Sequence, residues 1–242
     1  MAATAFLGFA PTFWAPIAQG VPERIVVIAL HATLFFAWTL FVVYQTWLVA
    51  SGRTARHRDT GLIGVSLATA MIIFGTLAAI NAAQRAAALN FATAGEAFMI
   101  VPISALVTFG VLFVAAIYNS RRFEWHKRLM LCASAVLLDA AIARPFIAYI
   151  VMGGHMPPFQ GTAGLAGFHG PPPAVAGVLP PALAALLFIV AGMVNDLRTD
   201  RKIHPAYLWA GGFALVVQLV KIPFSDTALW HDWARALISL AS

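Results

Sequence analysis

Residues 25–50 decide the class of this protein, because IVVIALHATLFFAWTLFVVYQTWLVA contains no Asp, Glu, Lys or Arg. A helix needs about 20 mainly apolar residues to cross the hydrocarbon core of a bilayer, so this stretch predicts a transmembrane helix. Five further runs of similar character lie at residues 62–86, 96–118, 129–152, 178–195 and 205–222. The sequence therefore predicts an all-α, polytopic membrane protein, with a six-helix bundle that forms a single transmembrane domain over residues 1–242.

The composition agrees with this prediction and excludes several classes of protein. The chain is 61% hydrophobic and 10% charged, with a mean hydropathy of +0.85, whereas soluble domains are about 25% charged. A chain this apolar cannot cover itself with polar surface, which excludes a water-soluble enzyme, a nucleic-acid reader and a disordered scaffold. The one cysteine, Cys132, excludes an intrachain disulfide.

Basic residues predict how the helices are oriented. Ten of the fifteen lie in three alternate connections: Arg53, Arg56 and Arg58; Arg121, Arg122, Lys127 and Arg128; Arg198, Arg201 and Lys202. Short loops rich in Lys and Arg stay in the cytoplasm, so both termini are expected on the periplasmic side of a bacterial inner membrane. The net charge of +6 then reflects contact with anionic lipid headgroups rather than with nucleic acid.

Both ends of the chain are predicted to lie in the membrane interface. Residues 1–22 carry Trp14 and three prolines but no positive charge before their apolar stretch, which is untypical of a signal peptide. Near the other end, Leu229, Trp233 and Leu237 recur every four residues, the pattern of an amphipathic interfacial helix or of a docking surface for a partner subunit. Residues 153–181 hold seven of the eighteen glycines and seven of the fourteen prolines, which predicts an outer loop that is either folded back on the helices or a partly mobile connector.

Ionisable residues at membrane depth form the first candidate site. Asp139 lies about ten residues into the fourth run, near the bilayer centre, and such residues usually face the bundle interior. By depth, a catalytic cluster of Asp139, His31 and Arg144 is expected, and Trp38 shares a helix face with His31. Substrate or partner contacts are expected from Gln218, Lys221, Glu96 and Trp38. The alternative is structural: the cations extend to headgroups and Asp139 joins two helices by a hydrogen bond.

Histidines form the second candidate site. The chain contains no H-E-x-x-H motif, histidine cluster or cysteine pair typical of a metal centre, so no metal site is predicted. A haem b site is still possible, because it needs none of these motifs and only one imidazole from each of two helices. His57 and His126 open helices of the same direction, and His31 is a third candidate ligand. In these positions and in helix count the chain resembles the six-helix haem b cytochromes of the ascorbate-linked type, although its third and fifth helices lack histidine.

Three longer stretches carry a second resemblance. HATLFFAWTLFVVYQ, ARHRDTGLIG and WHKRLMLCASAVLLDAAIARPF are similar to a family of uncharacterised bacterial membrane proteins. This resemblance implies a six-helix inner-membrane protein and no particular activity. Three functions stay open: a redox component with haem b or quinone, alone or within an electron-transfer complex; a binding or transport protein, or an enzyme, for a lipid or isoprenoid, with Asp139 as proton carrier; and a structural accessory subunit.

Overall fold

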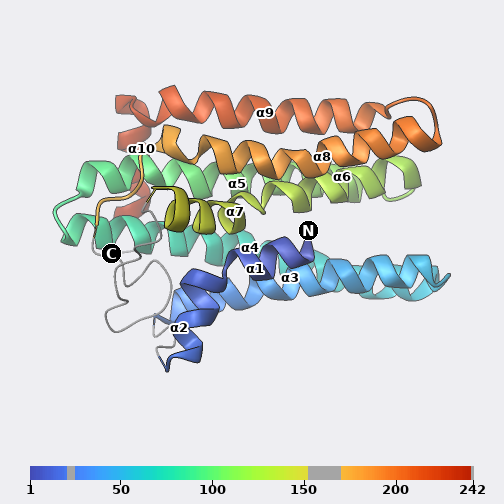
Figure 1. Cartoon of the computed structure of the whole chain (residues 1–242), viewed down its shortest axis with the longest axis horizontal. Helices are drawn as coiled ribbons and strands as arrows, with labels where there is room; N and C mark the ends of the chain where they lie inside the picture. The colour runs from blue at the N-terminus through green and yellow to red at the C-terminus, as the bar shows by residue number, and fades with distance from the viewer. Residues whose placement is uncertain (21–24, 152–169, 241–242) are drawn as a thin grey trace.

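The computed structural model describes residues 1–20, 25–151 and 170–240, and within these ranges the chain forms helices and no strands. Five helical segments of the described chain are long and apolar enough to cross a membrane. They are α3 (Val26–Ala50), α4 (Thr54–Ala88), α5 (Ala92–Tyr118), α8 (Leu179–Thr199) with the 3-10 turn Val175–Val178 before it, and α9 (Pro205–Ser225). These helices lie side by side (Figure 1), which confirms the prediction of an all-α membrane protein.

The fourth predicted run, 129–152, is not one helix, so six uninterrupted spans are not confirmed. The first part of the run belongs to α6 (Phe123–Val136), which starts before the run. The rest of the run contains α7 (Asp139–Pro145) and a π-helical segment (Phe146–Val151). At the break, the N–H of Leu138 donates to Ala135 O, three residues back, and Asp139 Oδ1 accepts the N–H of Ala140. An Asp side chain that takes a nearby backbone N–H competes with regular helix. The break therefore coincides with the central carboxylate of the predicted site.

The N-terminal segment differs from the interfacial helix that the sequence predicts. α1 (Ala2–Gly8) packs against α3 and α7, and Met1 lies near the middle of the bundle's length (Figure 1). The π-helical segment Ala10–Trp14 and α2 (Ala15–Ala18) follow it. Small residues allow this close packing: a Cβ on Gly8 would lie 2.1 Å from the carbonyl oxygen of Ala141. This segment is therefore part of the bundle wall.

The three basic connections lie at the same end of the bundle, as the charge pattern predicts. The α3–α4, α5–α6 and α8–α9 turns are together at the right of Figure 1, whereas α10 (Ala228–Ser239) lies at the opposite end. The hydroxyl of Thr227 caps α10 by accepting the N–H of Trp230. Of the Gly/Pro-rich stretch 153–181, residues 153–169 lie outside the described part of the chain.

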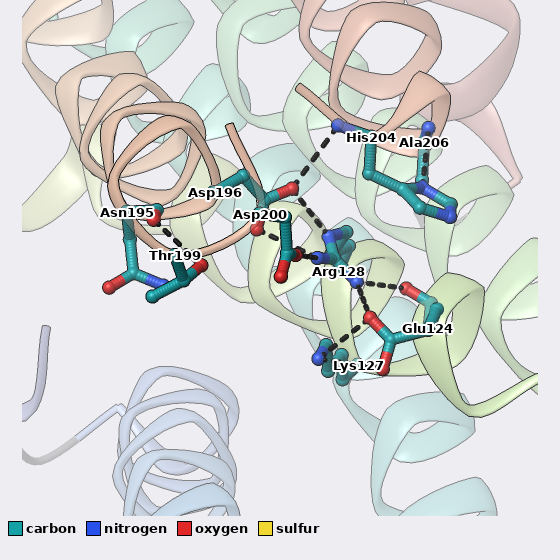
Figure 2. Close-up of polar contacts among 9 residues, drawn as sticks. All are labelled: Glu124, Lys127, Arg128, Asn195, Asp196, Thr199, Asp200, His204 and Ala206. Atoms are coloured by element: carbon teal, nitrogen blue, oxygen red, sulfur yellow. Dashed lines mark hydrogen bonds and ion pairs between the residues drawn. The ribbon is translucent and has the colours of Figure 1, made fainter. Parts of the chain in front are cut away.

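A buried ion-pair cluster joins three helices at the basic end (Figure 2). Arg128 of α6 donates two hydrogen bonds to the carboxylate of Asp196 on α8, at 2.8 and 2.7 Å. Asp196 also accepts the backbone N–H of His204, which precedes α9. Glu124 and Asp200 complete the surroundings of the guanidinium. Burial and the nearby positive charge of Arg128 lower the pKa of His204, whose neutral ring accepts the N–H of Ala206.

Candidate functional site

A largely apolar cavity of about 340 Å³ lies between the N-terminal segment, α3, α4, α5 and the break between α6 and α7. It follows α3 from Ile28 to Val43 and α4 from Gly75 to Arg85. At 1.5 Å per residue these stretches are roughly 22 and 15 Å long, so the cavity is elongated along the helices. Val43 is 50% exposed, which means that the cavity reaches the outer surface of α3.

Unpaired polar atoms distinguish this cavity from an ordinary packing defect. Five of its lining residues each have a buried side-chain nitrogen or oxygen with no hydrogen-bond partner among the described residues: Thr12 Oγ1, His31 Nδ1, Trp38 Nε1, Ser134 Oγ and Asp139 Oδ2. Leaving one buried polar group unpaired costs about 1–3 kcal/mol, and native structures contain few such groups. Five around one cavity indicate a bound molecule or ordered water in the functional protein.

Asp139 connects the cavity to α9. Its charged neighbours are Lys221 and Arg144, and the Gln218 amide lies beside it. Lys221 Nζ and Gln218 Oε1 are buried and have no hydrogen-bond partner within the described residues. Asp139 thus lies between two buried polar side chains of α9 and the cavity.

Arg144 and His31 also line the cavity, close to each other. The guanidinium of Arg144 donates to Ala140 O at 2.6 Å and lies 4.0 Å from the ring centroid of Phe9. The imidazole of His31 packs on the ring of Phe35, with centroids 4.3 Å apart, and Arg144 is its charged neighbour. α7 and the N-terminal segment together hold the Arg144 side chain at the cavity.

The structure brings most of the first predicted site together. His31, Trp38, Asp139 and Arg144 all line the cavity, and Gln218 and Lys221 are buried next to Asp139. Glu96 is engaged elsewhere. Its carboxylate accepts a 2.7 Å hydrogen bond from His231 of α10, and its backbone oxygen accepts one from Trp230 Nε1. Glu96 therefore anchors the C-terminal helix.

The second predicted site lies at the basic end. The rings of His57 on α4 and His126 on α6 are in contact, with centroids 6.2 Å apart and planes at 77°. His126 Nδ1 is 2.9 Å from the carbonyl oxygen of Ala116. Because a carbonyl only accepts, Nδ1 donates this hydrogen bond, so that Nε2 is the nitrogen with the lone pair in the neutral form of the ring. His31 is not part of this pair, since the part of α3 from His31 to Ala50 alone spans about 28 Å.

Sequence reasoning missed three elements of these sites. Thr12 belongs to a segment predicted to lie in the interface, and Ser134 carries no charge that would mark it within an apolar run. The Arg128–Asp196 pair joins residues 68 positions apart, a contact that no local pattern indicates. The spacing of Ser134, five residues before Asp139, gives no signal either, because it places the two side chains about 140° apart on a regular helix.

No protein-family model, curated protein or solved structure matches this chain. Within the described residues, no group of three His, Cys, Asp or Glu side chains is arranged to hold a metal ion. A function must therefore be inferred from the geometry of the cavity and of the histidine pair.

Proposed function

We propose that this chain is a bacterial inner-membrane protein that binds an amphipathic small molecule in the cavity between α3, α4 and α7. The proposal rests on one observation, which is that five unpaired polar atoms line a single, largely apolar cavity. Ligand sites typically combine an apolar lining with a few convergent polar groups and enclose about 300–1,000 Å³. A volume of about 340 Å³ suits a head group and the first part of a hydrocarbon tail.

The polar atoms can satisfy a head group that both donates and accepts hydrogen bonds. Trp38 Nε1 only donates, whereas Thr12 and Ser134 hydroxyls donate or accept. Asp139 and His31 are the two lining groups that exchange protons, so they suit proton transfer to or from a bound quinone, lipid or isoprenoid. The remaining tail has a path along α3 toward the exposed Val43 and hence toward the surrounding lipid.

Blocking the cavity tests this function. Ala82 lines the cavity and is exposed, so Ala82→Phe places a ring at the edge of the cavity without entering the core. Ala87→Phe places the same ring at an exposed position of the same helix that does not line the cavity. We expect mass spectrometry of solvent extracts to find a stoichiometric amphiphile with the wild type and Ala87→Phe, and much less with Ala82→Phe. Equal amounts in all three would contradict the proposal and favour the accessory-subunit hypothesis.

A second candidate function is electron transfer through haem b, favoured by the contact of His57 with His126. The residues fit this group: two imidazoles come from different helices, the Ala116 carbonyl orients one of them, and second-shell hydrogen bonds of this kind are typical of ligating histidines. Positive charge comes from Arg53, Arg121 and Arg122 in the adjoining turns and from Arg56 and Arg58 at the start of α4. When bound between two imidazoles, haem b supplies one-electron transfer.

A visible spectrum tests the haem hypothesis. We expect a reduced-minus-oxidised difference spectrum of haem b in the wild type, and its loss in His57→Leu and His126→Leu. His31→Leu serves as the control. His31 lies near the start of α3, far from the basic end where His57 and His126 are in contact, so this variant should keep the spectrum. A colourless, folded wild type made with ample haem would overturn this candidate and leave the cavity proposal unaffected.

A further inference from the structure

Positive charges outnumber negative charges at the cavity. The excess lies near Asp139 and Arg144, where the head group would bind. Arg144 lines the cavity and Lys221 is buried beside it, only 3% exposed. Within the described residues, Asp139 is the single acid that interacts with either of these cations. Two cations thus share one carboxylate, which leaves one positive charge uncompensated when all three are ionised.

An uncompensated charge at this depth is unfavourable. Ionisable side chains inside a membrane pair with one another or mark a substrate pathway, and removing a partner from a buried charge destabilises a protein strongly. The other described acids of the outer half are used elsewhere: Glu96 pairs with His231 and Arg235, Asp232 pairs with Arg235, and Asp226 accepts a hydrogen bond from Ser225. None of these three carboxylates lines the cavity.

Arg144 has the geometry to bind an anion. Its hydrogen bond to Ala140 O uses one of the five N–H groups of a guanidinium, and its stacking on Phe9 fixes the plane of the group. A planar, oriented guanidinium matches the paired oxygens of a carboxylate or a phosphate. Arg85 lines the same cavity from α4 and adds a further positive charge.

On the basis of the proposed function, we infer that the amphiphile carries an anionic head group, a carboxylate or a phosphate, which Arg144 binds while the hydrocarbon tail follows α3 and α4. The anion supplies the negative charge that Arg144 and Lys221 lack. Thr12, three residues after the Phe9 ring on which Arg144 stacks, lines the same cavity and can donate to a remaining oxygen. Asp139 balances the second cation.

Three probes that share one tail test this inference. Tritium-labelled hexadecanoate, hexadecyl phosphate and hexadecanol differ only in the head group. Their dissociation constants are measured by scintillation proximity on the purified, delipidated protein at mildly alkaline pH. We expect the carboxylate, the phosphate or both to bind at least about tenfold more tightly than the alcohol, as a charge-assisted hydrogen bond implies. The tighter of the two anions identifies the head group.

Variants connect this preference to Arg144. Arg144→Gln should lower the ratio of anion to alcohol affinity to within about twofold of unity, and Arg144→Lys should restore part of it. Arg235→Gln removes the same charge from the exposed face of α10 and should leave the ratio unchanged. Equal or tighter binding of the alcohol by the wild type would overturn the anionic head group but support the proposed function. Binding of none of the three probes would overturn both.

Discussion

At the scale of single residues, Arg128 is the cation whose charge is most completely satisfied in the described part of the chain. It is 2% exposed, makes two hydrogen bonds to Asp196 and is also paired with Glu124 and Asp200 (Figure 2). Lys221 is almost equally buried, yet its one described acidic neighbour is Asp139. The same chain thus contains a completed ion-pair cluster at the basic end and an incomplete one at the cavity. This contrast separates a structural role from a binding role.

The structural role of Arg128 predicts a large loss of stability when its main partner is neutralised. Asp196→Asn should lower the free energy of unfolding by about 3 kcal/mol, because it leaves a buried guanidinium without its bidentate carboxylate. Equilibrium unfolding in mixed micelles measures this change. Asp232→Asn breaks an exposed pair with Arg235 and should cost less than about 1 kcal/mol. A loss no larger than that of the control would show that Arg128 and Asp196 do not brace α6 and α8.

At the scale of the elements, two departures from a regular bundle create the cavity. The break between α6 and α7 places Asp139 inside the bundle, and α1 with the π-helical segment Ala10–Trp14 closes the side between α3 and α7. Periodicity and apolar length predict straight spans, so neither departure could be read from the sequence. The break depends on Asp139 competing for backbone hydrogen bonds, and the position of α1 depends on small residues meeting across helices.

The close contact of α1 with α7 gives a testable consequence. In Gly8→Ala the new methyl group would meet the backbone oxygen of Ala141 at 2.1 Å, so α1 must move away from α7. Ala5→Cys places a thiol on the buried face of α1, and its maleimide labelling in micelles should increase several-fold when Gly8→Ala is added. The native Cys132 is fully buried and gives little background.

Gly212→Ala, combined with Ala5→Cys, is the matched control for this experiment. A Cβ at Gly212 would meet no atom within 4 Å, so labelling at position 5 should stay at the level of Ala5→Cys alone. Unchanged labelling in the Gly8→Ala protein would show that α1 tolerates a side chain there, and that its packing on α7 is looser than the structure implies.

At the scale of the whole molecule, the sequence predicts the helical class, the bounds of most spans and the common end of the basic turns. These features follow from hydropathy and charge, which act over short stretches of chain. Of the first site, the sequence identifies His31, Trp38, Asp139 and Arg144, because polar residues are conspicuous in apolar runs. It misses Thr12 and the Arg128–Asp196 pair, which depend on contacts between distant segments.

The basic turns share one end of the bundle, so labelling from one side of the membrane can test the orientation and the number of crossings. Three exposed residues are suitable for substitution by cysteine: Ala88 at the end of α4, Ser120 after α5 and Ala174 before α8. With the basic turns in the cytoplasm, an impermeant maleimide should label Ala88→Cys on intact bacterial cells, and Ser120→Cys only after permeabilisation.

Ala174→Cys decides whether the interrupted segment of α6, α7 and Phe146–Val151 crosses the membrane. α5 ends at the basic end and α8 begins at the opposite end (Figure 1), so the segment between them must connect the two ends. We expect Ala174→Cys to be labelled from outside, as Ala88→Cys is, which would make six crossings with an interrupted fourth. Labelling only after permeabilisation would mean that this segment re-enters on the cytoplasmic side. The cavity would then lie beside a re-entrant element rather than inside a six-crossing bundle.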